Sequence, residues 1–502
     1  MRKQRLPGVH CSGAHRIEPS EPSPVYGGGQ GGGAPIATRG FAQTIGLIIF
    51  LSLSATTSAQ ERSLQAVIDD YVAEAMRSNL TLQGENFAVE QSRAALDAAR
   101  AHYLPELSLS ARYTVNQGGR DIEFPVGDLL NPVYSTLNDM LVAQGQSPRF
   151  PMLDNQSIPL MRPHEQDTHL SVRQPLYAPA VAAGVRAQQA LFDASRQQRI
   201  GVARQLKRDV TVAYLNWLQA SEAVQIVDST HTLLNENLRI NRSLFDNGKI
   251  TEDQPLRAQA ELLAIEQQQR QAQDAVKQAQ SYVNFLLNRS LDMPLESVAA
   301  PQATNAPAYE LAQLRSQATN QRPELKQLEQ GVVAANEQIK LARAEALPSL
   351  SLGVDAGIQG DKYGVGSDYN YASASLLLNW KFYAGGGLKA EVDGAKAQAR
   401  RLQVQRDALS QQINLQVQQA LDRYRTSVDS LTTALARTDA ARAAFRIAGR
   451  KRDEGAINQV EFLDARSTLT NAELNLNVTR YAALIEAAQL DYVTAEGVVS
   501  VP

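Results

Sequence analysis

The chain has 502 residues, with 49 basic and 52 acidic side chains, and long stretches of it are dominated by Gln, Ala, Leu and Arg. Aromatic residues make up only 6%, and proline is absent from residues 180–254 and 349–501, which is typical of long helices rather than of a compact mixed domain. The net charge is −3, so acidic residues slightly outnumber basic ones, and this argues against a nucleic-acid partner.

The first predicted segment is a leader over residues 1–59. The apolar run TIGLIIFLSLSA at 44–55 follows Arg39 and precedes small residues, an order typical of a secretory signal peptide cleaved after Ala59. The run is shorter than the roughly 20 residues that a membrane-spanning helix needs. The leader holds five basic and two acidic residues, so the predicted mature chain has a net charge of −6. It also holds Cys11, the single cysteine, so no disulfide or thiolate chemistry is expected.

The rest of the sequence is an internal repeat. ARAHYLPELSLS at residues 99–110 recurs as ARAEALPSLSLG at 342–353, an offset of 243. Further along, Tyr177 matches Tyr383 at an offset of 206, so one connection of the second half is 37 residues shorter. We expect each half to be one structural unit. The predicted boundaries are 60–298 for the first repeat and 299–502 for the second.

Each half contains two segments in which apolar and polar residues alternate, and this pattern predicts strands with two different faces. About ten such residues per segment are typical of a membrane β-barrel with lipid outside and water inside, although a soluble sheet over a core has the same alternation. The signal peptide and the strand length favour the barrel. The predicted strands cover about 105–117 and 167–177 in the first half, and about 348–359 and 369–383 in the second.

The connections between the strands differ in length. The first, about 117–165, is long and contains six prolines, whereas the second, GDKYGVGSD at 360–368, is short and rich in glycine. Long loops at one end of the strands and tight connections at the other are also found in outer-membrane barrels.

Long helices follow the strands in each half. The predicted helices cover about 179–246 and 252–289 in the first half, and about 387–453 and 458–496 in the second. Near 1.5 Å per residue, the first of them would extend roughly 100 Å. An apolar stripe with a spacing close to 3.7 residues predicts helices that pack side by side rather than in a tight supercoil. Its members are Leu409, Ile413, Val417, Ala420, Tyr424, Val428, Leu431 and Leu435.

Four strands are too few to close a barrel, which needs about eight or more. The chain must therefore oligomerise or leave sheet edges exposed, and three copies would supply twelve strands.

The ordered set of motifs resembles the TolC-like outer-membrane efflux protein family. It comprises the duplicated Leu-Pro entry into a strand, the Pro-Leu-Tyr and Phe-Tyr-x-Gly-Gly exits into long helices, and the duplicated G-x-I turn followed by L-x-A. The resemblance covers residues 62–497. It implies a mainly α-helical, internally duplicated homotrimer whose long helical tunnel continues into a twelve-stranded β-barrel.

The resemblance also implies a location and partners. The barrel would lie in outer-membrane lipid of a Gram-negative bacterium, and the tunnel would project into the periplasm. A periplasmic adaptor protein and an inner-membrane transporter would dock, and the channel would be the passive exit duct of an efflux or secretion system. The alternative is a secreted or surface coiled-coil structural or adhesin protein without a pore.

The resemblance places a periplasmic constriction at Glu461 and Asp464, just after the second G-x-I turn. Spaced i and i+3, they share a helix face, and three copies would give a ring of six carboxylates able to attract cations. The equivalent positions in the first half are Gln254 and Arg257, so only the second half can build this ring. A solvated helix face with incidental acids is the simpler alternative.

The same resemblance assigns the helix tips to adaptor docking. The residues carried over are Gly248, Ile250, Gly455 and Ile457, and the glycines also suit the ends of helices. Near the second turn, Arg450, Lys451 and Arg452 are candidate gate residues that could pair with an acid across the helix interface.

No enzyme, metal site or cofactor is predicted. HEQDTH at residues 164–169 places its histidines five apart, which does not bring them to one helical face, and it directly follows Pro163. The remaining histidines of the mature chain, His102 and His231, have no nucleophile and acid that complete a catalytic set.

Overall fold

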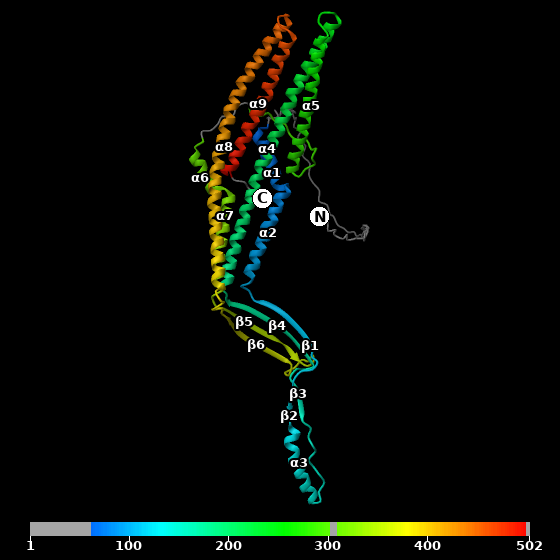
Figure 1. Cartoon of the computed structure of the whole chain (residues 1–502), viewed down its shortest axis with the longest axis vertical. Coiled ribbons are helices and arrows are strands. Elements are labelled where there is room, and N and C mark those ends of the chain that lie inside the picture. The colour runs from blue at the N-terminus through cyan, green and yellow to red at the C-terminus, as the bar shows by residue number, and fades with distance from the viewer. Residues whose placement is uncertain (1–61, 302–308, 498–502) are drawn as a thin grey trace, which may run out of the picture. The chain divides into compact units, whose positions relative to one another are not determined.

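The computed structural model describes residues 62–301 and 309–497, so the predicted leader and its cleavage site at Ala59 lie outside the described residues. The contacts divide the chain into residues 1–60 and 61–502, and the second unit contains every element described below. In chain order (Figure 1) these are α1 (Leu64–Ser78), α2 (Leu80–Ala101), β1 (Glu106–Val115), β2 (Asp121–Phe124), α3 (Val126–Ala143), β3 (Gln156–Pro159), β4 (His164–Tyr177), α4 (Pro179–Asp246), α5 (Asp253–Leu286), α6 (Leu311–Gln321), α7 (Pro323–Ala344), β5 (Ser349–Gly360), β6 (Asn370–Asn379), α8 (Gly387–Asp453) and α9 (Gln459–Thr494).

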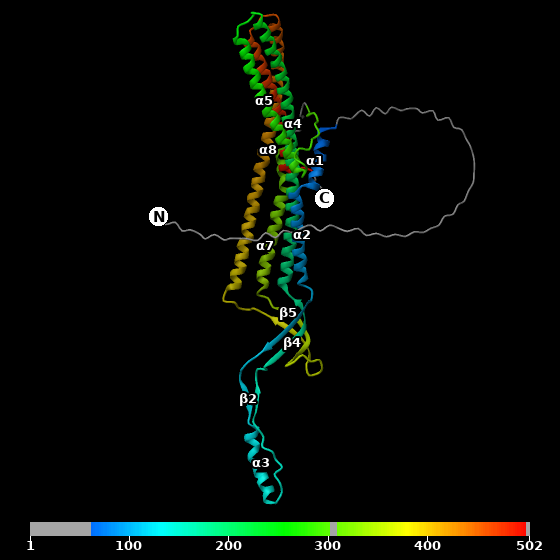
Figure 2. The same cartoon turned by 90° about the vertical axis from the view of Figure 1, so that its right-hand side faces the viewer.

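Two helices of nearly equal length organise this unit. α4 has 68 residues and α8 has 67, and at 1.5 Å per residue each extends roughly 100 Å. Near the sheet, α2 and α7 pack on α4, and α7 also packs on α8 (Figure 2). At the far end α5 returns along α4 and α9 returns along α8. Both halves of the sequence therefore build the same arrangement of helices and strands.

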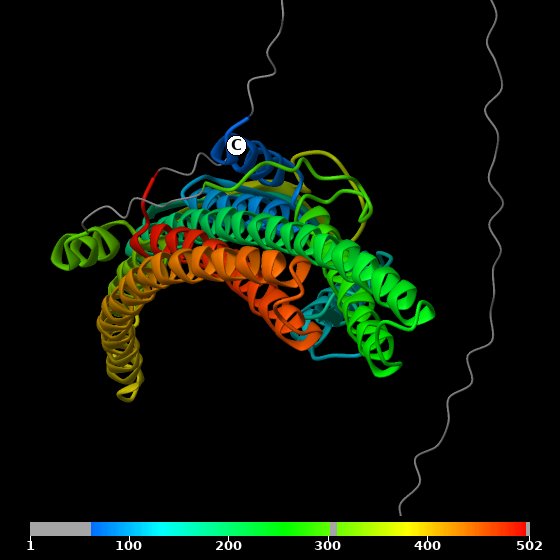
Figure 3. The ribbon, with the colours of Figure 1, turned by 90° about the horizontal axis from the view of Figure 1, so that it is seen from above.

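The helices are held together by apolar stripes. Of the predicted stripe on α8, Ile413, Val417 and Ala420 are fully buried and pack against α6, α7 and α9. A second cluster joins α1, α4, α5 and α9, where the rings of Tyr71 and Tyr214 meet edge to face at 5.2 Å. Figure 3 shows α4 and α8 curving along their length, as long helices do when one side packs on neighbours.

The junction between α6 and α7 contains a partly buried ion pair. Arg322, only 7% exposed, precedes Pro323 at the start of α7 and lies 3.0 Å from the carboxylate of Glu324. It also donates to Gln416 of α8 at 2.6 Å. Burial alone would raise the pKa of Glu324, but the hydrogen bond and charge of Arg322 hold it below its ordinary value.

The four long strands form one antiparallel sheet in the order β1-β4-β5-β6. In this register, directly paired residues form rows across all four strands, and the members of a row are similar in polarity. One row is apolar and consists of Leu107, Val172, Val354 and Ala374. The next row is polar and consists of Ser108, Ser171, Asp355 and Ser373. Since directly opposed residues share a face, the register gives one mainly apolar face and one mainly polar face, with Thr168 and Gln174 of β4 as polar residues on the apolar side.

The apolar face is exposed in the single chain. Leu109 of β1 is 73% exposed and Leu376 of β6 is 69% exposed. On the polar face, Asp167 lies 2.9 Å from the ring of His169 and 3.7 Å from Arg112. Gly357 permits close strand contact, because a Cβ there would be 2.3 Å from the carbonyl oxygen of Thr168. β1 and β6 are the edges of this sheet, and each pairs with one strand within the described residues.

The connection between β1 and β4 is more ordered than its prolines suggest. It holds the two-stranded β2-β3 sheet and the 18-residue helix α3, with Pro132 inside the helix. β4 begins at His164, three residues before the predicted strand. β6 ends at Asn379, before the predicted end at residue 383. The chain leaves the sheet there, and the Trp380 indole donates to the Ala346 carbonyl oxygen at 3.1 Å. Within the described ranges, no helix is long and apolar enough to cross a membrane.

Candidate functional site

Two helical hairpins form the tips farthest from the sheet, and both turns have the same backbone geometry. In the first, Gly248 N–H donates to Phe245 O and Lys249 N–H donates to Leu244 O, both at 2.8 Å. In the second, Gly455 N–H donates to Arg452 O at 2.9 Å and Ala456 N–H to Lys451 O at 2.7 Å. This pair of bonds is the Schellman motif, which satisfies the last carbonyl groups of a helix.

The motif explains why glycine stands at both turns. Gly248 has φ +69° and Gly455 has φ +72°, left-handed values that other residues adopt only with strain. Nothing lies within 4 Å of a Cβ built at either position, so a substitution would meet strain but no clash. The glycines, together with the half-buried Ile250 and Ile457, therefore form two similar tips with open surroundings.

The predicted constriction residues lie on the second tip. Glu461 and Asp464 are both exposed in the first turns of α9, and neither forms an ion pair within the described part of the chain. At the equivalent positions of the first tip, Gln254 is half-buried, and Arg257 lies 3.8 Å from Asp253. A pair of unneutralised carboxylates at these positions is thus a property of the second tip.

Glu461 has a structural role that sequence reasoning missed. Asn458 is the N-cap of α9, and its side-chain oxygen accepts from the Glu461 N–H at 2.9 Å. Its amide nitrogen donates to the Glu461 carboxylate at 3.0 Å. This resembles a capping box, for which the sequence signal is N-x-x-E at residues 458–461. The cap fixes the direction of the Glu461 side chain.

The three basic candidates end α8 and do not pair with an acid of α9. Arg452 lies over the ring of Phe462 at 4.0 Å and bonds Asp453 of its own helix at 3.2 Å. For Arg450 and Lys451, residues 62–301 and 309–497 provide no ion-pair partner, so the expected pairing across the helix interface is not found. The phenyl ring of Phe462 accounts for the difference, because it occupies the face that Arg452 covers. All three side chains lie in the last turn of α8, where their positive charges interact favourably with the negative, C-terminal end of the helix dipole.

A second feature missed from sequence lies where the strands meet the helices. Large aromatic side chains are exposed there, namely Tyr103, Tyr177, Trp380, Phe382 and Tyr383. At the opposite end of the sheet, the rings of Tyr113 and Tyr363 stack at 6.3 Å. Aromatic residues at both ends of an apolar band are typical of strands that cross a bilayer.

The histidines of HEQDTH lie in β4 and not on a helix. The described ranges contain no group of three or more side chains suited to hold a metal ion.

Comparison with known proteins agrees with this architecture. The profile of the family described as "Outer membrane efflux protein" matches residues 155–289 and 314–496. The probable efflux pump outer membrane protein TtgC of Pseudomonas putida is 26% identical over 305 residues, which cover 59% of this chain and 61% of that protein. The alignment thus spans less than two thirds of this relative.

Solved structures show the same fold. The outer-membrane channel OprN has a TM-score of 0.70 at 18% identity, with 86% of this chain and 90% of that chain covered. The CmeC outer membrane channel of Campylobacter jejuni has a TM-score of 0.68 at 17% identity, with 85% of each chain covered. The fold expected from the sequence, with long helices joined to membrane strands, is confirmed by these similarities.

Proposed function

The chain belongs to the outer membrane efflux protein family, and on this basis we propose that three copies form a passive exit channel across the outer membrane. Members of this family are channels of the Gram-negative outer membrane and not enzymes. The proposed channel serves a tripartite efflux or secretion system, in which an inner-membrane transporter supplies the energy. The sheet contacts outer-membrane lipid, and the helices form a tunnel in the periplasm.

The four-stranded sheet carries this proposal. Its apolar residues form one exposed face, and its edges β1 and β6 remain available for pairing. Ten residues of β1 extend roughly 33 Å, and a barrel strand tilted by about 40° would then cover an apolar band near 25 Å. Three copies joined from β6 to β1 would close twelve strands and leave no open edge.

The alternative of a coiled-coil structural or adhesin protein without a pore does not explain this sheet. A soluble sheet would cover its apolar face with a core, whereas Leu107, Leu109 and Leu376 are all more than half exposed. The aromatic residues at both ends of the strands support lipid as the medium that covers them.

The tips are the proposed sites of docking and constriction. An adaptor protein would contact Gly248 and Ile250 of the first tip and Gly455 and Ile457 of the second. Glu461 and Asp464 of three copies would surround the tunnel axis with six carboxylates. Arg450, Lys451 and Arg452 belong to the proposed gate region, where Arg452 acts through its contact with Phe462.

The proposal is tested by isolating the protein from outer-membrane fractions and recording it in planar bilayers. We expect heat-modifiable trimers and discrete single-channel conductance. A monomeric protein that never conducts would contradict the channel and favour the structural alternative.

Docking is tested separately by replacing Gly248 or Gly455 with valine. We expect loss of transport and of adaptor copurification, while trimers remain in the outer membrane, because the left-handed turn is strained without disturbing the sheet. Matched replacement of Gly394, a helical glycine of α8 with nothing within 4 Å of a built Cβ, should leave transport intact. Retained adaptor binding in both tip variants would contradict docking there.

A further inference from the structure

The connection between β1 and β4 carries the helix α3, which lies beyond β2 and β3 (Figure 1). Because α2 leads into β1 and α4 follows β4, this connection lies at the end of the sheet opposite the long helices. In the proposed channel that end is extracellular. The equivalent connection of the second half, residues 361–369, contains no helix. Each chain thus contributes one such helix to the extracellular side.

One face of α3 is held by the chain that returns from it. Asn131 donates to the Leu153 carbonyl oxygen at 2.9 Å and accepts from the Leu153 N–H at 2.8 Å. Two turns later, Asn138 donates to the Phe150 carbonyl oxygen at 2.7 Å and accepts from the Phe150 N–H at 3.0 Å. The ring of Tyr134 lies 5.3 Å from the ring of Phe150. These contacts fix the rotation of α3 about its own axis and thereby decide which face points away from the chain.

The face beside these contacts is an apolar seam. Its members are spaced alternately by four and three residues and are Val126, Leu130, Val133, Leu137 and Met140. Val133 is 52% exposed and Met140 is 58% exposed. Alternating steps of four and three form the heptad pattern through which one helix packs on another. Within the described ranges, however, no other helix packs along α3.

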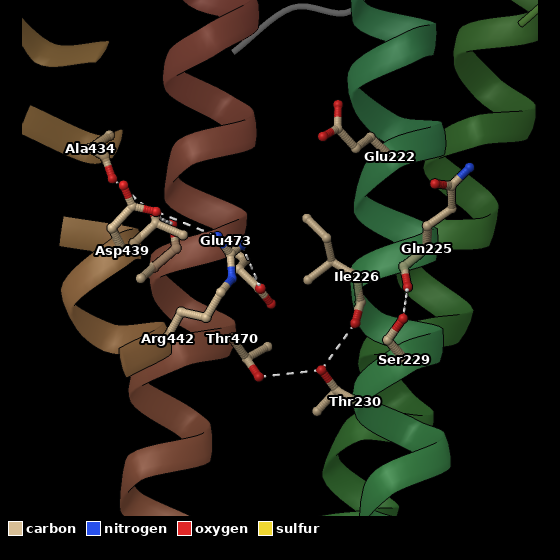
Figure 4. A network of polar contacts seen from close by, with 12 residues as sticks. Glu222, Gln225, Ile226, Ser229, Thr230, Ala434, Asp439, Arg442, Thr470 and Glu473 are labelled. Carbon is tan, nitrogen blue, oxygen red and sulfur yellow. Dashed lines mark hydrogen bonds and ion pairs between the residues drawn. The ribbon is translucent and has the colours of Figure 1, made fainter. Parts of the chain in front are cut away.

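The long helices of the same chain differ from α3 in this respect. They bury apolar stripes against one another and pair the polar groups at their interfaces. Where α4 meets α9, the hydroxyls of Thr230 and Thr470 lie 3.2 Å apart, and where α8 meets α9, Arg442 lies 3.2 Å from Glu473 (Figure 4). In α3 the polar face has its partners, and the apolar seam has none among the described residues. A contiguous exposed apolar face of this kind marks an interaction surface.

The charges of α3 favour another helix over a lipid surface as the partner of the seam. Helices that lie on membranes are rich in Lys and Arg on their polar face. Residues 126–143 contain Asp128 and Asp139 and no basic residue. Neither acid is a member of the seam, and Asp128 accepts from the Asn155 side chain at 3.0 Å. Copies of α3 can therefore approach through the seam without bringing these carboxylates into the contact.

The dimensions allow three copies of α3 to meet. Twelve strands about 4.8 Å apart and tilted by about 40° enclose a circle of roughly 12 Å radius. The 18 residues of α3 extend roughly 27 Å, about twice this radius. A helix that starts near the rim of the barrel can therefore reach the axis.

We propose that the α3 helices of three copies pack on one another through this seam and form a three-helix bundle at the extracellular exit of the channel. This inference rests on the proposed barrel of three copies. Free helices of 18 residues are marginal in water, but the barrel tethers them, and tethered partners associate at effective concentrations near the mM range. The three-fold axis brings each residue of the seam next to its own copies.

The first experiment uses single cysteines, because the predicted mature chain has none. Val133→Cys is compared with Val142→Cys, the same substitution two and a half turns later and therefore on the opposite side of the helix. The two valines are similarly exposed in the single chain, at 52% and 57%. Intact cells are labelled with a membrane-impermeant maleimide, and a second sample is oxidised and run on non-reducing gels. We expect labelling to be about tenfold slower for Val133→Cys, which corresponds to a bundle favoured by about 1.4 kcal/mol.

Disulfide-linked dimers should form in the Val133→Cys variant alone. With one cysteine per chain, no larger covalent product is expected. Unheated gels of the same membranes show whether trimers form, which separates this inference from the proposed function. Trimers in which both variants are labelled at equal rates would overturn the bundle. Slow labelling of Val133→Cys without a disulfide would also overturn it, because lipid or another protein would then cover the seam. Absence of trimers would contradict both proposals.

The second experiment places charge in the seam. Leu137→Asp, added to Val133→Cys, brings three carboxylates together at the axis and should raise the labelling rate to that of Val142→Cys. Val142→Asp, added to Val133→Cys, is the matched control and should leave the labelling slow. Both changes are at exposed positions, so trimers should persist in each variant. Equally slow labelling with and without Leu137→Asp would refute the packing of α3 through this seam.

Discussion

The proposed carboxylate ring makes a quantitative prediction for cation block. Glu461→Gln combined with Asp464→Asn removes two charges per chain, or six from three copies. The change retains the helix cap, because a glutamine oxygen can still accept from Asn458 as the Glu461 carboxylate does at 3.0 Å. The double variant therefore separates the charge of these residues from their structural contribution.

The size of the effect follows from Coulomb's law. A carboxylate about 7 Å from a divalent cation contributes roughly 1 kcal/mol in water, and physiological salt reduces this to about half. Six such groups contribute about 3 kcal/mol, which corresponds to roughly a hundredfold change in the blocking concentration. Asp464→Asn alone removes half of the charges and should raise the blocking concentration about tenfold. On the first tip, Arg257 is neutralised by Asp253, whereas Glu461 and Asp464 on the second tip have no ion-pair partner in the described part of the chain.

The assay is single-channel recording with a divalent cation on the periplasmic side. Glu252→Gln with Asp253→Asn is the matched control, because it removes two exposed acids from the first tip. Asn458→Ala, which should cost about 1 kcal/mol of stability through loss of the cap, tests whether the cap alone affects block. An unchanged blocking concentration in the double variant, or an equal change in the first-tip control, would refute the ring.

Three further predictions concern the sheet, the helical part and the tip. Leu109→Arg on the apolar face should destabilise the membrane-inserted protein by about 2–4 kcal/mol and so lower the yield of folded outer-membrane protein. Ser110→Arg on the other face should be tolerated, and equal yields of the two variants would argue against lipid contact. Glu324→Gln should reduce the free energy of unfolding by about 1 kcal/mol at pH 7. The pKa of Glu324 is lower in the folded than in the unfolded chain, so the difference in free energy of unfolding between the wild type and the variant should persist above the unfolded pKa. It should disappear as pH falls through the folded pKa. Denaturant titrations that show the opposite trend would contradict the ion pair. Phe462→Leu should free Arg452 and increase proteolysis at the second turn, and unchanged cleavage kinetics would exclude a role of this contact in holding the turn.

Much of the fold was predictable because its signals are local and occur twice. The alternation from Leu107 to Val115 sets the strand faces whatever the partner strand is, and the register aligns these faces across the sheet. Gly248 and Gly455 mark the ends of the long helices because the left-handed turn requires them. The long proline-free stretches then predict α4 and α8 from composition alone. The division into repeats at residues 298 and 299 stays a prediction.

Other features depend on contacts between residues distant in sequence. The helix α3 was hidden because Pro132 lies inside it and prolines surround it. The contact of Arg452 with Phe462 joins two helices, and only their packing decides that the guanidinium meets this ring and not an acid of α9. Arg466 of α9 is a charged residue that is only 7% exposed, and its burial follows from the packing of α9 on α4.

The capping role of Glu461 was visible in the sequence as N-x-x-E after the turn, but the residue was interpreted only through its charge. Both roles are compatible, because the cap fixes the carboxylate and leaves it exposed.

In the proposed channel, three copies close one barrel by pairing β6 of one chain with β1 of the next. Site-directed disulfide cross-linking can detect this pairing, because the predicted mature chain has no cysteine of its own. One cysteine on β1, at Ser110, is combined with a series of single cysteines along β6, and non-reducing gels are run on outer membranes from intact cells. We expect covalent dimers and trimers, and nothing larger, at one register of the series. Monomers at every register, or a ladder that continues beyond three copies, would contradict it.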